Sequence, residues 1–238
     1  MANFTVSDLD IMSIANNYNK WLCGLIAPFL SECILEIGSG TGNLTRLIIE
    51  KCKKVSELTC VEIDSECVKE LKKNLDKLDK AFPVNIYTGD FVHFNTDKKF
   101  DVVFAMNVFE HIEDHAGALD KIHSFLNEGG RIVLLVPAFQ FLYGSIDKEL
   151  KHYRRYGKKE LESVLNDAGF KVEFARYYNI VGFFGWWMNN RLLKKRSQSL
   201  TQVRIFDRII LPIQSSVESV LSLPFGQNLL YVGQKKPK

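Results

Sequence analysis

The chain has 238 residues, 46% of them hydrophobic and 25% charged, which suits a globular protein with ample core. A net charge of +3 is too small to indicate a nucleic-acid or membrane-binding protein by itself. The five cysteines form no C-x-x-C pair, which argues against a disulfide framework or a cysteine-based zinc site. We therefore expect reduced thiols, a cytoplasmic location and no bound metal.

The first predicted element is a helix over residues 5–31. Ile11, Ile14, Tyr18 and Trp21 lie on one apolar stripe of this helix. Pro28 is expected to end or kink it. The N-terminus lacks the basic start and long apolar segment of a signal peptide, and no stretch resembles a membrane-spanning helix.

A glycine-rich turn follows the first predicted strand. The stretch Cys33–Thr45 reads CILEIGSGTGNLT, in which the buried strand 34–37 precedes Gly38, Gly40 and Gly42 and a new helix. Glycines allow close approach of a ligand, and a helix N-terminus offers free N–H groups. The pattern therefore predicts a nucleotide site, although a tight turn without a ligand is the simpler alternative.

The glycine spacing distinguishes between cofactors. A dinucleotide fingerprint would place its third glycine at position 43, which is Asn43. Glu36, two residues before the first glycine, would repel a pyrophosphate and attract an α-amino group. The stretch resembles motif I, acidic-x-G-x-G-x-G, of the class I S-adenosylmethionine (SAM) methyltransferases.

Further strands alternate with helices along the chain. Strands are predicted over 57–63, 84–88, 100–106, 131–136, 171–178 and 229–234, with helices over 66–78, 119–126 and 158–168. This alternation predicts an α/β fold with a doubly wound, mostly parallel, seven-stranded sheet. The family resemblance covers roughly residues 30–180 and implies the same fold.

The resemblance also implies how the cofactor is held. Glu62, beside Ile63 at the second strand end, would bind the ribose diol, while Asp64 is better explained as a helix cap. Asp90 would bind the adenine amine, and Phe91 would pack on the adenine ring. The plainer alternatives are an exposed carboxylate at Glu62 and a turn aspartate at Asp90.

Two more residues complete the predicted cofactor site. Tyr18 lies on the helix that in this family caps the cleft, although it is equally explained as a core residue. Asn107, at the end of the fourth strand, would lie beside the sulfonium and orient the methionine part of SAM.

The segment after the fourth strand carries the first candidate base. It contains Glu110, His111 and Asp114 and lacks the N/D-P-P-Y/F tetrapeptide of nucleobase amino methyltransferases. This E-H-I-x-D segment resembles the small-molecule and lipid-quinone branch of the family. His111 could act as a base and Glu110 could orient it or meet an ammonium group. Alternatively, His111 packs structurally near the cofactor.

The loop after the fifth strand carries a second set of candidates: Tyr143, His152, Tyr153, Arg154 and Arg155. The combination Y-G-x-x-D and H-Y-R-R-Y resembles a bacterial and archaeal subgroup whose genes accompany surface-sugar and polyprenyl-linked glycan synthesis. His152 could be the base, the tyrosines could contact substrate, and either arginine could bind a phosphate or carboxylate. Alternatively, Arg155 pairs with Asp147 or Glu160 and only fixes the loop.

A long insertion separates the last two strands. Residues 180–227 begin with aromatic side chains, including Trp186, and continue with a cluster of cations. Helices are expected over 202–210 and 215–223, with Pro212 and Pro224 as breaks. Aromatic residues beside cations are typical of a membrane interface, and a packed helical cap or a dimer contact is the alternative.

These observations predict one methyltransferase domain, with an N-terminal cap (1–31), a SAM-binding core (32–179), the insertion (180–227), and a last strand and tail (228–238). It would transfer a methyl group from SAM, leaving S-adenosylhomocysteine, to a hydroxyl or amine of a small molecule, sugar or polyprenyl glycolipid. We expect a monomer or homodimer without nucleic acid, in the cytoplasm or peripheral to the inner membrane face. The alternatives are an RNA methyltransferase and a non-catalytic SAM-binding partner protein.

Overall fold

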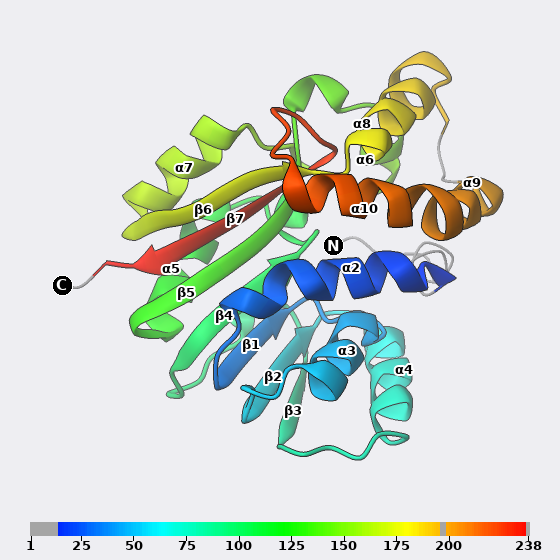
Figure 1. Ribbon diagram of the computed structural model, residues 1–238. Helices are drawn as coiled ribbons and strands as arrows, with labels where there is room; N and C mark the ends of the chain where they lie inside the picture. Colours follow the sequence, from blue (N-terminus) through cyan, green and yellow to red (C-terminus); the bar gives the residue numbers. More distant parts are fainter. Residues whose placement is uncertain (1–13, 196–198, 237–238) are drawn as a thin grey trace.

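A mixed seven-stranded sheet forms the centre of the molecule, which a computed structural model describes over residues 14–195 and 199–236 (Figure 1). The strand order is β3-β2-β1-β4-β5-β7-β6, and β7 runs antiparallel to both of its neighbours. The strands are β1 Cys33–Ile37, β2 Glu57–Glu62, β3 Val84–Thr88, β4 Phe100–Met106, β5 Leu126–Pro137, β6 Phe170–Tyr178 and β7 Asn228–Lys235. The predicted fold class is confirmed.

Helices cover both faces of the sheet. The α-helices are α2 Asn16–Ile26, α3 Asn43–Lys51, α4 Ser65–Leu75, α5 His115–Phe125, α6 Ser145–Glu149, α7 Lys158–Asp167, α8 Ile180–Trp186, α9 Leu200–Ile205 and α10 Leu211–Val220. One core cluster packs α5 and α7 against the sheet, and a second packs α2, α3 and α4 against the opposite face. All five cysteines are free, and none is fully exposed.

Most predicted element ends lie within two residues of the observed ones. Helix α4 is an exception, because it ends at Leu75 rather than at residue 78, and three further differences follow. Helix α5 begins at His115, four residues before the predicted start, because the Asp114 side chain accepts a hydrogen bond from the Gly117 N–H and caps the helix. Strand β5 begins at Leu126, where it pairs with Phe100, and continues through the glycines that were expected to precede it. The predicted helix over 5–31 ends in a short 3₁₀ turn containing Pro28, and its part before Ile14 lies outside the described residues.

The prediction that Pro212 separates two helices is wrong. The chain stays helical from Leu200 to Val220, with a π-helical segment, η6 Phe206–Ile210, directly before the proline. Proline inside an α-helix lacks one N–H donor and clashes with a carbonyl one turn earlier. Pro212 lies in the first turn of α10, where its missing N–H needs no partner. The wider π turn before it relieves the clash with the preceding carbonyl.

The α9–α10 helix is attached to the rest of the molecule by buried carboxylates. Asp207 accepts hydrogen bonds from the backbone N–H groups of Asn17 (3.3 Å) and Tyr18 (2.8 Å) at the start of α2. Glu218 accepts from the N–H groups of Asn179 (3.1 Å) and Ile180 (2.9 Å) at the start of α8. Free N–H groups at a helix start favour a negative charge, so one helix caps two others.

Candidate functional site

A cleft of about 680 Å³ opens at the carboxyl ends of β1, β2 and β4, beneath α2 and the insertion. This volume is within the range of roughly 300–1,000 Å³ for small-molecule sites. The position next to the sheet's central crossover is where ligands bind in doubly wound folds. The predicted site residues that line it are Tyr18, Glu36, Gly38, Gly40, Glu62, Ile63, Asp90, Phe91, Asn107, Glu110, His111, His152, Arg155 and Trp186.

The glycine turn forms one wall of the cleft. Gly38 has a φ of 74°, and a Cβ there would lie 2.4 Å from a methyl group of Val108. Only glycine therefore lets this turn approach the segment after β4. Gly42 has a φ of 84° and lies against Leu71, outside the cleft lining, so it shapes the start of α3 without facing the cavity.

Glu36 is buried at the end of β1 and faces the cleft. One carboxylate oxygen accepts a hydrogen bond from the Thr45 hydroxyl at 2.7 Å. Burial raises the pKa of Glu36 to about 7, and the nearby charge of Glu62 adds to this effect. The site thus holds a carboxyl group whose ionisation would be favoured by an incoming cation.

Glu62 is fixed at the end of β2 by two backbone donors. Its oxygens accept from the N–H groups of Gly40 at 2.7 Å and Asp64 at 3.0 Å. Burial raises its pKa despite these bonds. Asp64 caps α4 by accepting from the N–H groups of Glu66 and Cys67, as expected. Each Glu62 oxygen keeps a further acceptor position for two neighbouring hydroxyl groups.

The remaining cofactor candidates surround the same cavity. Asp90 accepts from the Val92 N–H, and Phe91 is buried beside it. Asn107 has a φ of 54°, an uncommon backbone conformation for a residue other than glycine. Its side-chain oxygen accepts from the Asn228 amide at 3.3 Å. Tyr18 is buried within the second core cluster and also lines the cleft, so its position is compatible with both interpretations.

The H-Y-R-R-Y loop is attached to the segment after β4. The Tyr153 N–H donates to the Glu110 carbonyl at 2.8 Å, and the Arg154 guanidinium donates to the carbonyls of Ile112 and Glu113. Tyr143 donates through its hydroxyl to the His152 carbonyl at 2.7 Å. Tyr143, Tyr153 and Arg154 are not among the residues that line the cleft, and their contacts fix the loop to itself and to the segment after β4.

Asp147 organises the buried part of this loop. It is completely buried, and its Oδ1 accepts from Arg155 Nε at 2.7 Å and lies 3.0 Å from His152 Nδ1. Burial alone would raise the pKa of Asp147, but the hydrogen bond from His152 and the charge of Arg155 lower it to about 2. The pairing of Arg155 with Asp147, proposed from the sequence as an alternative, is confirmed. Arg155 nevertheless keeps a buried Nη2 that has no hydrogen-bond partner among the described residues.

Glu110 and His111 lie beside His152 in the cleft. The rings of His111 and His152 are 4.6 Å apart between centroids. Burial lowers the pKa of His111 to about 3, with a contribution from the charge of His152, while burial raises the pKa of Glu110 to about 7. A histidine that is so hard to protonate is a weak base, which argues against His111 in that role.

Sequence reasoning gave no functional role to two residues that hold this site together. Asp147 was considered only as a partner of Arg155, yet it also accepts from the Trp186 indole at 3.3 Å. Asn190, in the π-helical segment η5 Trp187–Leu192, donates to Asp147 at 2.5 Å. The Y-G-x-x-D motif was the signal for Asp147, whereas no local pattern indicated Asn190.

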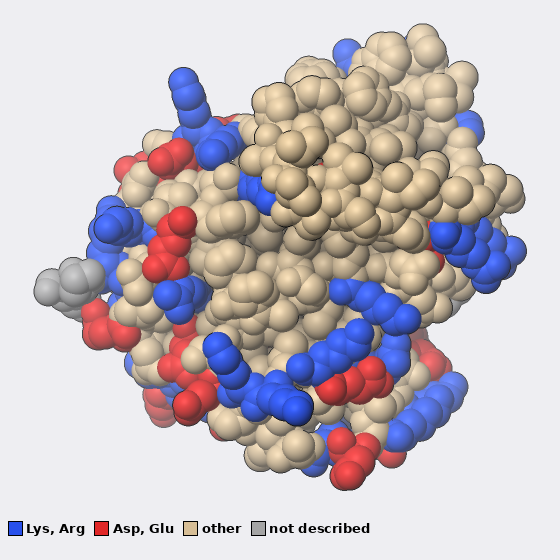
Figure 2. Space-filling view, viewed as in Figure 1, with Lys and Arg blue, Asp and Glu red and all other residues tan. Residues whose placement is uncertain are grey.

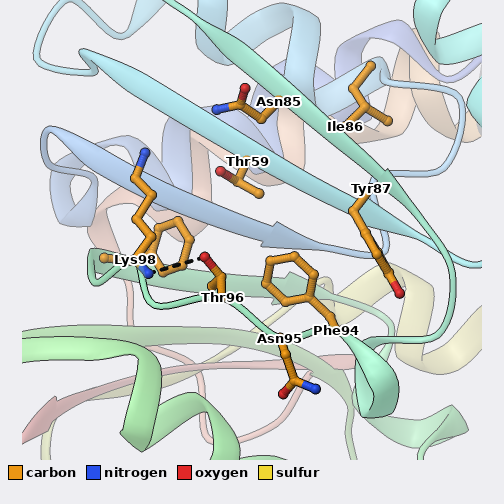
Figure 3. Close-up of a pocket in the computed structure, with 9 residues that line it drawn as sticks. Thr59, Asn85, Ile86, Tyr87, Phe94, Asn95, Thr96 and Lys98 are labelled. Atoms are coloured by element: carbon orange, nitrogen blue, oxygen red, sulfur yellow. Dashed lines mark hydrogen bonds between the residues drawn. The ribbon is translucent and has the colours of Figure 1, made fainter.

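A smaller cavity of about 230 Å³ lies along β2 and β3 (Figure 3). Thr59, Asn85 and Tyr87 border it, together with Thr96 and Lys98 from the segment before β4. None of the predicted site residues lines it, so we assign the functional site to the larger cleft.

The fold and the cleft define a nucleotide-binding enzyme of the Rossmann-like α/β class. A profile described as a methyltransferase domain matches residues 17–174. The chain belongs to this family and is a SAM-dependent methyltransferase.

Known relatives agree with this assignment. Malonyl-(acyl-carrier protein) O-methyltransferase 1 of Ilyobacter polytropus is 23% identical over 74% of this chain and 70% of its own length. A second enzyme of that name from the same organism is 28% identical over 56% of this chain, which spans only about half (53%) of that relative. The N-methyltransferase NodS of Bradyrhizobium japonicum, solved with S-adenosyl-L-homocysteine, has a TM-score of 0.56 at 14% identity and covers 92% of this chain and 85% of its own.

The residues of the cleft fit SAM. Gly38 and Gly40 line the cleft, and Glu62 and Asp90 present carboxylates at successive strand ends. Glu36 would meet the α-ammonium group of the methionine part, as the family resemblance implies. SAM supplies, when bound, a methyl group activated by the sulfonium charge.

The raised pKa of Glu36 predicts that SAM affinity depends on pH. A cation binds the ionised carboxylate, so below a pKa of about 7 a proton must first be released. We expect affinity to fall by up to about tenfold for each pH unit below 7. Calorimetric titration with SAM between pH 5.5 and 7.5 measures this slope. Glu36→Gln should bind more weakly and without the slope, and an equal slope in that variant would contradict the role of Glu36.

Proposed function

We propose that the enzyme methylates an oxygen or nitrogen of a sugar attached to a polyprenyl or similar lipid. The observation that carries this proposal is the composition of the cleft beyond the cofactor residues. That part is roofed by the insertion, where Val181, Trp186, Met188 and Phe206 are among the lining residues. An apolar roof suits a lipid chain, and the polar groups below it suit a sugar.

The polar groups face the expected position of the acceptor. His152 donates from Nδ1 to Asp147, which leaves Nε2 able to accept a proton from a hydroxyl group. The buried Arg155 Nη2 can donate to a phosphate or carboxylate oxygen. Aligning the acceptor with the methyl group and accepting its proton are the two tasks that the protein must perform.

The outer face of the insertion supports a lipid-bound acceptor. Exposed apolar side chains recur about every four residues on the α9–α10 helix and form what we name the apolar stripe: Ile205, Ile209, Ile213, Val217, Val220 and Leu221. Figure 2 shows that the surface over α8 and α10 is almost uncharged, whereas charged residues crowd the lower part of the molecule around α3 and α4. Arg204 and Arg208 are exposed on the same helix, as expected for contact with anionic headgroups. Among the described residues, no helix has the length and apolarity needed to cross a bilayer.

The apolar stripe predicts reversible membrane association. The protein should float with vesicles of phosphatidylethanolamine and phosphatidylglycerol, and the bound fraction should fall as salt is raised. The double variant Ile209→Ser with Ile213→Ser should bind at least about tenfold more weakly, because two half-inserted side chains are lost. Val92→Ser is the matched control, since Val92 is equally apolar and 52% exposed on a different element. Absence of flotation by the unaltered protein would contradict this surface role.

The choice of acceptor is tested by methyl transfer. With methyl-labelled SAM, we expect label in the lipid phase when vesicles carry a polyprenyl diphosphate sugar with free hydroxyls. The malonyl thioester of acyl carrier protein is the comparison acceptor, chosen because the two relatives are named for it. Transfer to the thioester alone would replace the glycolipid proposal with a carboxyl acceptor. Label in neither would reject both.

A further inference from the structure

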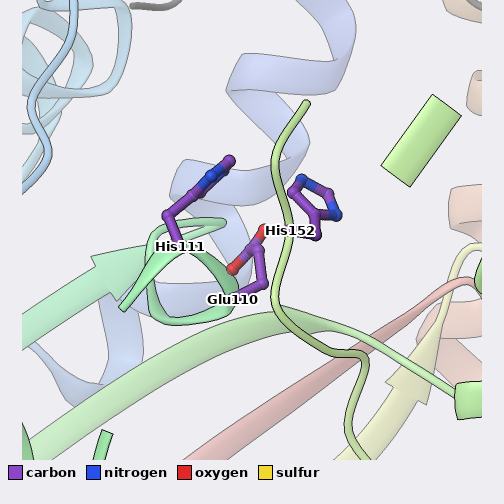
Figure 4. Close-up of side chains that lie close together, drawn as sticks. All are labelled: Glu110, His111 and His152. Atoms are coloured by element: carbon purple, nitrogen blue, oxygen red, sulfur yellow. The ribbon is translucent and has the colours of Figure 1, made fainter. Parts of the chain in front are cut away.

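Three potential metal ligands meet in the cleft where the segment after β4 contacts the H-Y-R-R-Y loop. Glu110, His111 and His152 each offer one ligand atom, and these atoms all lie within 4.8 Å of one another. Figure 4 shows the Glu110 carboxylate directed between the two imidazole rings. All three residues line the cleft, which supplies a path for an ion.

The Glu110 carboxylate is the second, independent observation. Its side chain is buried, with 1% of the residue exposed, and its Oε2 has no hydrogen-bond partner among the described residues. A buried carboxylate oxygen without a donor is costly unless a cation or a donor meets it. The structure therefore leaves an acceptor at a position that two histidines border.

We propose that Glu110, His111 and His152 bind a divalent transition-metal ion, with Zn²⁺ the best match to these donors. Two imidazoles and one carboxylate, with a fourth position open, are a recurrent ligand set of catalytic zinc sites. Tetrahedral ligands about 2.1 Å from the ion lie roughly 3.4 Å apart. The ligand atoms lie within 4.8 Å of one another, so binding would draw them together by up to about 1.4 Å.

Asp147 supplies the outer support that such sites use. Metal-binding histidines commonly donate their second ring N–H to a carboxylate, which fixes the ring and its tautomer. His152 meets this condition through Nδ1 and Asp147 at 3.0 Å, so Nε2 is the coordinating nitrogen. Arg155 and Asn190 hold Asp147 in turn, and the whole support is buried.

The open position of the ion faces the cleft and would hold an oxygen of the acceptor, a role that rests on the proposed function. The same His152 nitrogen cannot coordinate an ion and accept a proton at once. Metal binding would therefore replace the base role of His152, since a bound ion lowers the pKa of a coordinated hydroxyl group and lets its proton pass to water.

The test is binding of Zn²⁺ alone to the full-length protein after chelation and dialysis, without SAM or acceptor. Calorimetry should show one ion bound per chain, and Co²⁺ in its place should give the visible absorption of a tetrahedral site. His152→Ala and Glu110→Gln should each weaken Zn²⁺ binding at least about tenfold, the scale of effects seen even for outer-shell changes. His93→Ala is the control, because His93 is exposed on a different element and should leave affinity unchanged.

Two results would overturn the proposal. One is no Zn²⁺ or Co²⁺ binding by the unaltered protein. The other is binding that survives both cluster variants, which indicates a site elsewhere on the surface. Circular dichroism checks that each variant is folded, and His111→Gln replaces any variant that is not. Because no methyl transfer is measured, failure of the glycolipid proposal leaves this outcome unaffected.

Discussion

Replacing Glu62 with alanine should weaken SAM binding by about 10²–10⁴-fold while the protein stays folded. Hydrogen bonds to a charged group contribute about 1.5–3 kcal/mol each, and two ribose hydroxyls would lose their acceptor. The Glu62 carboxylate also accepts hydrogen bonds from the N–H groups of Gly40 and Asp64, so its removal should loosen the glycine turn as well. Both effects act on the cofactor, and calorimetric titration with SAM measures their sum.

Two control variants separate these effects. Glu62→Gln keeps the size of the side chain but offers one acceptor oxygen, so an intermediate affinity is expected. Asp64→Ala removes the cap of α4, which should cost about 1 kcal/mol of folding stability and leave SAM affinity nearly unchanged. If Asp64→Ala were the more damaging variant for binding, the ribose role would move from Glu62 to Asp64.

Replacing Asp147 with asparagine should lower the free energy of unfolding by about 3–5 kcal/mol. This is the usual cost of breaking a buried ion pair, because the charge of Arg155 is left without a counter-ion. The amide NH2 group of asparagine is itself a hydrogen-bond donor, and it would face the donating groups of His152 and Asn190. Urea denaturation at pH 7 measures the loss, with Asp120→Ala, an exposed aspartate on α5, as the control expected to stay within about 0.5 kcal/mol.

The pH dependence of this loss has a definite sign. The pKa of Asp147 is lowered from 3.8 to about 2 in the folded protein, so its carboxylate stabilises the fold above pH 3.8. That contribution disappears as the pH falls toward 2, and the difference between the two proteins should shrink over that interval. In a double-mutant cycle, Arg155→Met should cost less in the Asp147→Asn background than alone. Equal costs in both backgrounds would show that the pair is not coupled.

The sheet and the cofactor half of the cleft were predictable because their signals are local. Buried strands are short apolar runs, so strands such as β3 and β4 were predicted at their observed bounds. The glycine turn carries its own backbone requirement, visible in the positive φ values of Gly38 and Gly42. The family resemblance pointed to Glu62 and Asp90, and both line the cleft because the carboxyl ends of neighbouring parallel strands meet at one edge.

The insertion was less predictable because its contacts join residues far apart in the sequence. Asp207 binds the start of α2 across 189 or more residues, and nothing near either partner indicates the pairing. Likewise, Asn190 reaches Asp147 across 43 residues. Pro212 was predicted to end a helix, as proline usually does, but the π-helical segment before it allows the helix to continue. The sequence could not show which arginine of the H-Y-R-R-Y loop faces the cleft. In the fold, Arg155 lines the cleft and its neighbour Arg154 does not.

The capping of α2 and α8 by the α9–α10 helix has a consequence for engineering and for evolution. The extra segment between β6 and β7 is not a removable module, although the family profile matches residues 17–174 and ends before it. Trimming it to a simple hairpin would uncap two helix starts and remove Leu211 from the core beneath α2. Chimeras that exchange the insertion (residues 180–227) between relatives should therefore exchange α2 together with it.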